Sequence, residues 1–230
     1  MLKKIISHVS PSIRQAAISF TLLCLMFAIV EPAVSIGATT TSQFTISQTV
    51  NAEIAFATPA SNVTMSPSLG GITGGTANGA TQVIVTTNSL GGYTMTLAAS
   101  SSLGMIGNAS STYYIPAYVP STGGVPDYTF TVPANAARFG YSVKATTTSD
   151  VAQLFRDNGS ACNTGSNNTA GQCWLNASTS AVTIINRTTP TPANGATTTI
   201  NFRVGISSNP NPVIPNDTYV ATTTLTATTQ

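Results

Sequence analysis

Two cysteines and three loop aromatics are the residues of this chain that could form a covalent link or bind a ligand. Cys162 and Cys173 enclose a short polar stretch, NTGSNNTAGQ. Tyr113, Tyr114 and Trp174 lie in stretches without a strand pattern, and Trp174 is the only tryptophan. Aromatic rings on loops can stack on sugars or fill a partner's pocket, but a ring beside a disulfide more often covers it. The three aromatics are therefore candidate binding residues, and the cysteines are a candidate structural pair.

Catalytic groups are scarce after residue 38. The only histidine is His8, so no Ser-His-Asp or Cys-His arrangement can form in the later part of the chain. The acidic residues of that part are scattered, and none resembles half of a glycoside hydrolase pair. They are Glu53, Asp127, Asp150, Asp157 and Asp217. Zinc ligands and a phosphate-binding Gly-Lys loop are also absent from the sequence. We expect no enzyme activity and no cofactor.

Calcium is a separate question, because several oxygen-bearing side chains are close together in sequence. They are Asp150, Asp157, Asn158 and Ser160. Their spacing is not that of an EF-hand, and isolated Asp residues in turns usually serve the turn. A site assembled from distant loops stays open as an alternative, but we expect no metal.

The first 38 residues have the pattern of a signal peptide. The basic residues come first: Lys3, Lys4 and Arg14. An uncharged apolar run over residues 16–30 and a small-residue stretch up to Ala38 follow. A helix of this run reaches roughly 22 Å, short of the ~30 Å hydrocarbon core, which favours removal over anchoring. We expect residues 1–38 to be cleaved off after Ser35 or Ala38, and residues 39–230 to form a single secreted or cell-surface domain.

Export decides how the cysteines are interpreted. Removal of the signal peptide takes Cys24 with it and leaves the pair Cys162 and Cys173. An even pair in an exported chain predicts a disulfide, and the chain-entropy model gives so short a loop roughly 3 kcal/mol. The membrane is then a partner only through the signal peptide before cleavage.

The remaining residues carry almost no charge. Five basic and five acidic side chains give residues 39–230 a formal net charge of zero. Ordinary soluble domains have about 25 % charged residues, so a neutral, Thr-rich surface is suited to packing beside copies of itself or other envelope components. The alternative is that a Thr- and Asn-rich surface is simply typical of secreted proteins. A nucleic acid partner is excluded, because five scattered basic residues make no phosphate-neutralising stripe.

Apolar residues recur with a period of two along most of the chain, and no long window has a helical apolar face. About nine strands are predicted, over residues 44–50, 52–56, 83–85, 93–97, 128–132, 139–143, 182–184, 200–206 and 219–227. Turn signals such as Asn78-Gly79, Ser89 to Gly92 and Asn194-Gly195 separate them. Many short strands with regular turns indicate an all-β, antiparallel sandwich or barrel. Residues 100–125 and 146–180 fall outside the pattern and are predicted to be two loop insertions.

One five-residue sequence occurs twice. Ala-Asn-Gly-Ala-Thr stands at residues 77–81 and again at 193–197, each time leading into a predicted strand. The repeat predicts two hairpins in related positions, with coincidence in a Thr-, Ala- and Gly-rich chain as the alternative.

Three stretches carry a resemblance to known families. VIVTTNSLGGYTMTL and the closing PNDTYVATTTLTAT resemble the immunoglobulin-like surface domains of bacteria that include the Trp-x-Leu cell-wall-binding family, with Gly92-Tyr93-Thr94-Met95 where Gly-Trp-x-Leu would stand. The same ending, with FGYSVKATTTSDVAQLFRDNG, is similar to the spore coat U and archaic chaperone-usher pilin group. The resemblance implies an immunoglobulin-like β-sandwich, and the second family implies subunits joined by donated strands.

Two functional hypotheses follow. The first is a non-catalytic, exported structural or adhesive surface protein, such as a self-associating pilus-like or surface-layer subunit, in which residues 39–50 are donated to a neighbour. The alternative is a monomeric module that binds cell-wall glycan or peptide through Tyr113, Tyr114 and Trp174.

Overall fold

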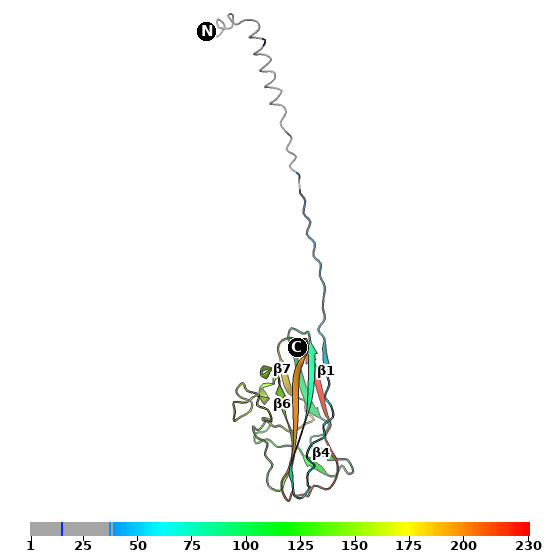
Figure 1. Ribbon diagram of the computed structural model, residues 1–230, viewed down its shortest axis with the longest axis vertical. Coiled ribbons are helices and arrows are strands. Elements are labelled where there is room, and N and C mark those ends of the chain that lie inside the picture. The colour runs from blue at the N-terminus through cyan, green and yellow to red at the C-terminus, as the bar shows by residue number, and fades with distance from the viewer. Residues whose placement is uncertain (1–14, 16–36, 38) are drawn as a thin grey trace. The chain divides into compact units, whose positions relative to one another are not determined.

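The computed structural model of the protein describes residues 15, 37 and 39–230 (Figure 1). The predicted signal peptide therefore lies almost entirely outside the described residues. The chain divides into two units, Met1–Thr49 and Val50–Gln230. Residues 39–49 form no helix or strand, and no helix in the described part of the chain is long and apolar enough to cross a membrane.

The second unit is an all-β structure, as predicted, and its strands pair antiparallel in three sheets. The strands are β1 Ile54–Thr58, β2 Gly75–Thr87, β3 Tyr93–Ala99, β4 Gly104–Gly107, β5 Tyr114–Pro116, β6 Ala137–Ala145, β7 Val182–Arg187, β8 Ala196–Ile206, β9 Tyr219–Val220 and β10 Thr223–Thr229. Two short 3₁₀ helices, η3 Thr148–Asp150 and η4 Gln153–Phe155, lie between β6 and β7. The first sheet has the order β1-β2-β8-β6, the second β10-β3-β7 and the third β5-β4-β9.

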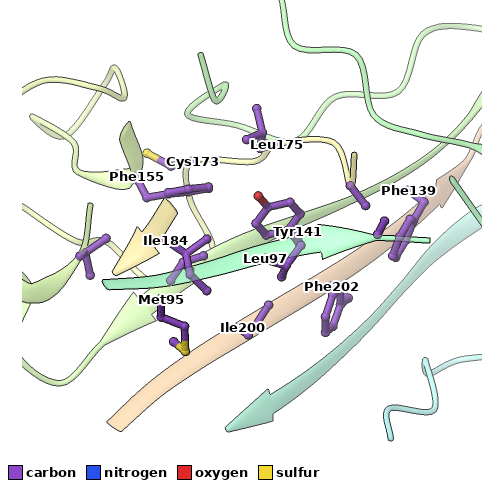
Figure 2. Close-up of a cluster of buried hydrophobic side chains, with 14 of the residues drawn as sticks. Met95, Leu97, Phe139, Tyr141, Phe155, Cys173, Leu175, Ile184, Ile200 and Phe202 are labelled. Atoms are coloured by element: carbon purple, nitrogen blue, oxygen red, sulfur yellow. The ribbon is translucent and has the colours of Figure 1, made fainter. Parts of the chain in front are cut away.

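The first and second sheets share one hydrophobic cluster. Alternate residues of each central strand are buried, for example Val83 and Val85 on β2 and Met95 and Leu97 on β3. Figure 2 shows side chains from β3, β6, β7 and β8 gathered in this cluster. The period of two in the sequence thus places every second side chain in the core, because successive side chains of a strand point to opposite faces.

Three predicted strands differ in the structure. Residues 44–50 form none, and their side chains are exposed, because a strand needs a partner and no described strand pairs with them. Residues 128–132 form none either, since only the adjacent Asp127 is bridged, to Trp174. Residues 219–227 divide into β9, which pairs with β4, and β10, which pairs with β3.

The turn predicted at Asn78-Gly79 is wrong, because both residues lie inside β2. Asn78 exchanges backbone hydrogen bonds with Ser66, at 2.8 and 2.9 Å. A Cβ on Gly79 would collide with Val63 and Met65. Glycine here lets the segment before β2 lie directly against the strand, so the residue serves a close approach and not a turn.

The prediction of a loop insertion over residues 100–125 is also wrong, because this stretch contains β4 and β5 of the third sheet. The second insertion, residues 146–180, holds η3 and η4 and no named strand. This second insertion covers one edge of the first sheet and one edge of the second sheet. Leu175 exchanges hydrogen bonds of 2.9 Å with Tyr141 on β6, and the Ala152 N–H donates to Ile184 O on β7 at 3.0 Å. The insertion thus shields two strand edges that would otherwise be open.

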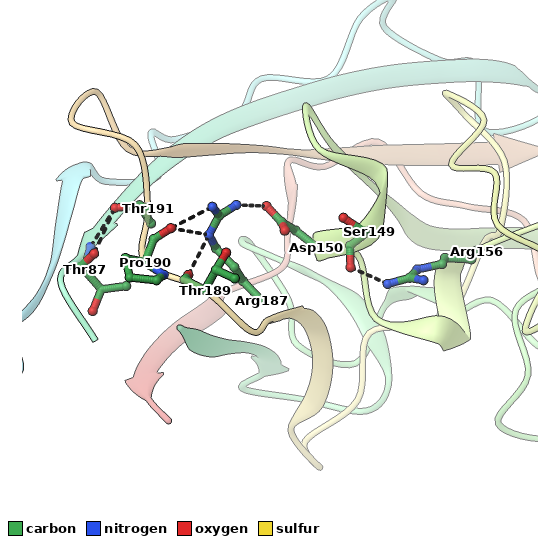
Figure 3. A network of polar contacts seen from close by, with 8 residues as sticks. All are labelled: Thr87, Ser149, Asp150, Arg156, Arg187, Thr189, Pro190 and Thr191. Carbon is green, nitrogen blue, oxygen red and sulfur yellow. Dashed lines mark hydrogen bonds and ion pairs between the residues drawn. The ribbon is translucent and has the colours of Figure 1, made fainter. Parts of the chain in front are cut away.

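A buried ion pair fixes the chain where it leaves the second sheet (Figure 3). The Arg187 guanidinium at the end of β7 lies 2.6 Å from Asp150 of η3, and both side chains are about nine-tenths buried. The same guanidinium donates to the carbonyls of Thr189 and Pro190. The Thr87 N–H then donates to Thr191 Oγ1 at 2.9 Å, which ties the crossing segment to β2. One cation therefore links η3, β7 and the connection to the first sheet.

We expect Arg187→Met to lower the free energy of unfolding by about 3 kcal/mol, because it leaves the Asp150 carboxylate buried and unpaired. Urea unfolding measures the loss. The double variant Arg187→Met, Asp150→Asn should lose less free energy of unfolding than the single variant, because it no longer buries an unpaired charge. A double variant less stable than the single one would show that charge burial is not the cause.

A second prediction concerns alkaline stability. Burial, assisted by the nearby Asp150 charge, raises the pKa of Tyr93 to about 12, and burial also raises the pKa of Tyr141. Between pH 10 and 12 the unfolded chain releases the Tyr93 proton while the folded chain keeps it, so stability falls as pH rises, by on the order of 1 kcal/mol per pH unit. Urea unfolding at several pH values should show a shallower decline for Tyr93→Phe than for wild type. Parallel declines would contradict the assignment.

Candidate functional site

The predicted disulfide is confirmed and closes the loop after η4. Cys162 and Cys173 are joined, with their Cα atoms 5.7 Å apart. The loop is also organised by Asp157, whose side chain is fully buried. Its carboxylate accepts hydrogen bonds from the Gly159 N–H at 2.9 Å and from the N–H and hydroxyl of Thr169 at 2.9 and 3.1 Å. A covalent link and a satisfied carboxylate together hold this polar loop in one conformation, and a disulfide fits an extracytoplasmic protein.

The residues considered for calcium have other partners. Asp150 pairs with Arg187, Asp157 accepts N–H groups, and the Asn158 side chain accepts from the Ser160 and Ala161 N–H groups. In residues 39–230 no three His, Cys, Asp or Glu side chains lie close enough together to hold a metal ion. Asp157 and Asn158 thus act as turn and loop residues, and Asp150 acts in the ion pair with Arg187.

Trp174 is buried in an aromatic cluster on the outer face of the first sheet. Its ring is 1 % exposed, and its indole N–H donates to Gly171 O at 2.8 Å. Phe130 lies edge-on to it at 5.2 Å, and the guanidinium of Arg203 on β8 lies 4.4 Å from the indole ring centroid. Cation–π contact and burial hold the indole in place, so its faces are covered by the protein itself.

Tyr113 and Tyr114 lie elsewhere, at the start of β5, and remain about half exposed. They line a cleft of 250 Å³ together with the first residues of β6 and the Pro-rich loop 211–215. Trp174 is not among the residues that line this cleft. The structure therefore brings two of the three candidate aromatics together and leaves the third in the protein interior.

A larger groove of 630 Å³ lies between residues 59–65 and residues 220–225, which include the end of β9 and the start of β10. Its lining includes Phe139, Ile200 and Phe202, which belong to the shared core cluster. Phe56, Met65 and Leu225 line it as well and are half-buried. The groove thus extends down to side chains of the core, which are themselves buried.

One wall of the groove is an unpaired strand edge, because β10 is the terminal strand of its sheet. The Ser100 N–H donates to Thr222 O at 2.9 Å, and the Gln230 N–H donates to Gly92 O at 3.1 Å. Alternate residues of an antiparallel strand bond the same partner, so even-numbered residues of this stretch face β3. Thr223, Leu225, Ala227 and Thr229 direct their backbone groups away from β3, and their side chains are half-buried.

The N-terminal segment has the opposite character to this groove. Phe44, Ile46 and Val50 are 82 %, 84 % and 79 % exposed. They alternate with Thr45, Ser47 and other polar residues, in the same register that continues through Ile54 and Phe56 of β1. The segment therefore has the pattern of a strand with one apolar face, but no described strand pairs with it.

The sequence pattern did not predict the groove, and it did not predict that residues 211–215 line the cleft beside Tyr114. Alternation identified Ile200, Phe202 and Leu225 as inward-facing, but it could not show that they line a groove. The exposed alternation at residues 44–50 was the one signal in the sequence for an unpaired strand. A scan against protein-family models finds no family that matches this chain, and a search of curated proteins finds no match.

Trp174→Ala should lower the free energy of unfolding by about 3 kcal/mol or more, because it empties a buried site and removes the contact with Arg203. Tyr113→Ala, at a half-exposed ring, should change it by less than about 1 kcal/mol. Urea unfolding of both variants tests the difference. Equal stability of Trp174→Ala and wild type would contradict the buried packing role.

Proposed function

We propose that this protein is a non-catalytic, exported surface subunit that assembles with copies of itself. In this proposal the first and second sheets are the layers of an immunoglobulin-like sandwich that lacks one edge strand. The missing strand is residues 43–50 of a second copy, added at the free edge of β10. The observation that carries the proposal is the groove beside the free edge of β10, which is lined by the buried side chains of Phe139, Ile200 and Phe202.

The donated segment and the groove match in chemistry. Strand addition uses main-chain hydrogen bonds for affinity and alternate side chains for specificity. The outward N–H and C=O groups of Thr223, Leu225 and Ala227 would form the main-chain hydrogen bonds. Phe44 and Ile46 would enter the groove as the alternate side chains that give specificity, while the polar residues between them stay in water. Burial of an exposed Phe and Ile side chain is worth about 1.5–3 kcal/mol each, which favours association.

The length and the charge of the segment also support the proposal. Residues 43–50 span roughly 26 Å as a strand, and the seven residues of β10 span about 23 Å. Residues 39–53 contain a single charged side chain, Glu53, and residues 39–230 have no net formal charge. No electrostatic repulsion therefore opposes close packing of copies.

The non-catalytic part of the proposal rests on how the acidic side chains are used. Asp150 pairs with Arg187, and Asp157 and Asp217 accept backbone N–H groups. Asp127 accepts from Ser121 and from the Tyr118 hydroxyl, and these bonds outweigh its burial, so its pKa lies below the ordinary value. These four carboxylates are thus engaged in bonds that hold the fold together, and the lowered pKa of Asp127 makes that group a poor general acid.

Ile46→Asp should abolish self-assembly of the mature chain, because a charge would have to enter the apolar groove. Ser47→Asp is the matched control, since it adds the same charge one residue later, on the face that stays in water. We expect the control to assemble like wild type. Light scattering after size-exclusion chromatography and electron microscopy of the secreted protein measure the result.

Two outcomes with the mature chain at its full length would contradict the proposal. One is a mature wild-type chain that stays monomeric at every concentration. The other is equal assembly of both variants, which would show that the register of residues 43–50 does not matter. A chain beginning at Val50 that still polymerised would likewise exclude the donated strand.

A further inference from the structure

The cleft beside Tyr114 is a second place where the surface has unused binding groups. Tyr113 is 48 % and Tyr114 is 40 % exposed, and neither phenol hydroxyl has a hydrogen-bond partner within residues 39–230. Pro116 and Pro212 add further apolar surface to the same cleft. Two adjacent aromatic rings with exposed faces are costly to leave in water and suit a ligand that offers flat C–H surface.

The cleft also carries one charge. Arg138 on β6 lines it, and none of the other lining residues is acidic or basic. Its guanidinium donates once, to Ala137 O at 2.9 Å, and its other N–H groups have no partner in the described part of the chain. Every other arginine of residues 39–230 donates a side-chain hydrogen bond to a residue beyond its neighbours: Arg156 to Val151 O, Arg187 to Asp150 and Arg203 to Asn78. The guanidinium of Arg138 therefore has N–H donors available for an anion.

We propose that this cleft binds a carboxylate-bearing saccharide. The Tyr113 and Tyr114 rings would contact the apolar faces of sugar rings, and the Arg138 guanidinium would bind the carboxylate through paired N–H donors. The side-chain amide of Asn211, which makes no hydrogen bond within the described residues, would serve a sugar hydroxyl. A volume of 250 Å³ suits a small sugar unit and excludes a folded protein segment.

The charge is what favours an acidic saccharide over a neutral one. A buried or half-buried guanidinium gains most from an ionised partner, because charge-assisted hydrogen bonds are about twice as strong as neutral ones. The proposal does not rest on assembly, because the cleft and the groove beside β10 share no lining residue. It assigns a ligand class to Tyr113 and Tyr114 and replaces Trp174 by Arg138 as their partner.

Isothermal titration of the mature protein with trigalacturonate and with sialyllactose tests the proposal, with the methyl ester of each as its neutral counterpart. We expect the acids to bind and the esters to bind about tenfold more weakly. Arg138→Gln should reduce acid binding about tenfold, the value of one charged hydrogen bond. Lys144→Gln, the same charge change on the same strand at an exposed position outside the cleft, should leave it unchanged. Tyr114→Ala should weaken the binding of the acids and of the esters to the same extent.

Several outcomes would overturn the proposal. They are equal binding of acid and ester, equal effects of Arg138→Gln and Lys144→Gln, or no binding of either acid at millimolar concentration. Binding of a short peptide with a free C-terminal carboxylate in place of both sugars would assign the cleft to peptides. Thermal unfolding of each variant confirms folding, and normal assembly of Arg138→Gln separates this result from the proposed function.

Discussion

The structure depends on keeping water from one hydrophobic cluster that two sheets share. Neither sheet can bury its inward face alone, so every gap around the cluster has to be covered by other parts of the chain. The insertion between β6 and β7 covers two strand edges, and its own shape is set by the Cys162–Cys173 link and the buried Asp157. Arg187 and Asp150 then fix this insertion to the second sheet. The buried polar contacts thus hold in place the segments that cover the hydrophobic cluster.

A groove reaches this cluster along one margin of the described residues. Between residues 59–65 and β10, core side chains such as Ile200 and Phe202 line an open groove. The same chain carries Phe44 and Ile46 on an exposed N-terminal segment without a sheet partner. In the proposed assembly, the exposed apolar strand pattern of one copy fills the groove of another. Their coexistence in one chain is what gives the proposed assembly its basis.

Charge is used sparingly, and its placement is informative for that reason. With five basic and five acidic residues after position 38, most charged groups have an identifiable structural partner. Arg203 lies over the Trp174 ring, and Asp217 accepts the Ala109 N–H near β9. Arg138 differs, because it lies in a cleft with two exposed tyrosines and without an acid. In so neutral a surface, a cation in a cleft without an acidic partner is a strong local feature.

The sequence by itself determined the class of the fold, the disulfide and most inward-facing residues, because these follow from local composition and from a period of two. It could not determine which strands pair or which layer is complete, since alternation gives faces but not neighbours. The repeated Ala-Asn-Gly-Ala-Thr shows this. One copy lies inside β2 and the other forms the turn before β8, and those two strands are adjacent in the first sheet. Gly79 and Gly195 have the same flanking residues, so only the chain packed against each decided between strand and turn. In the same way, burial of Trp174 and exposure of Tyr114 were settled by distant segments that local sequence does not encode.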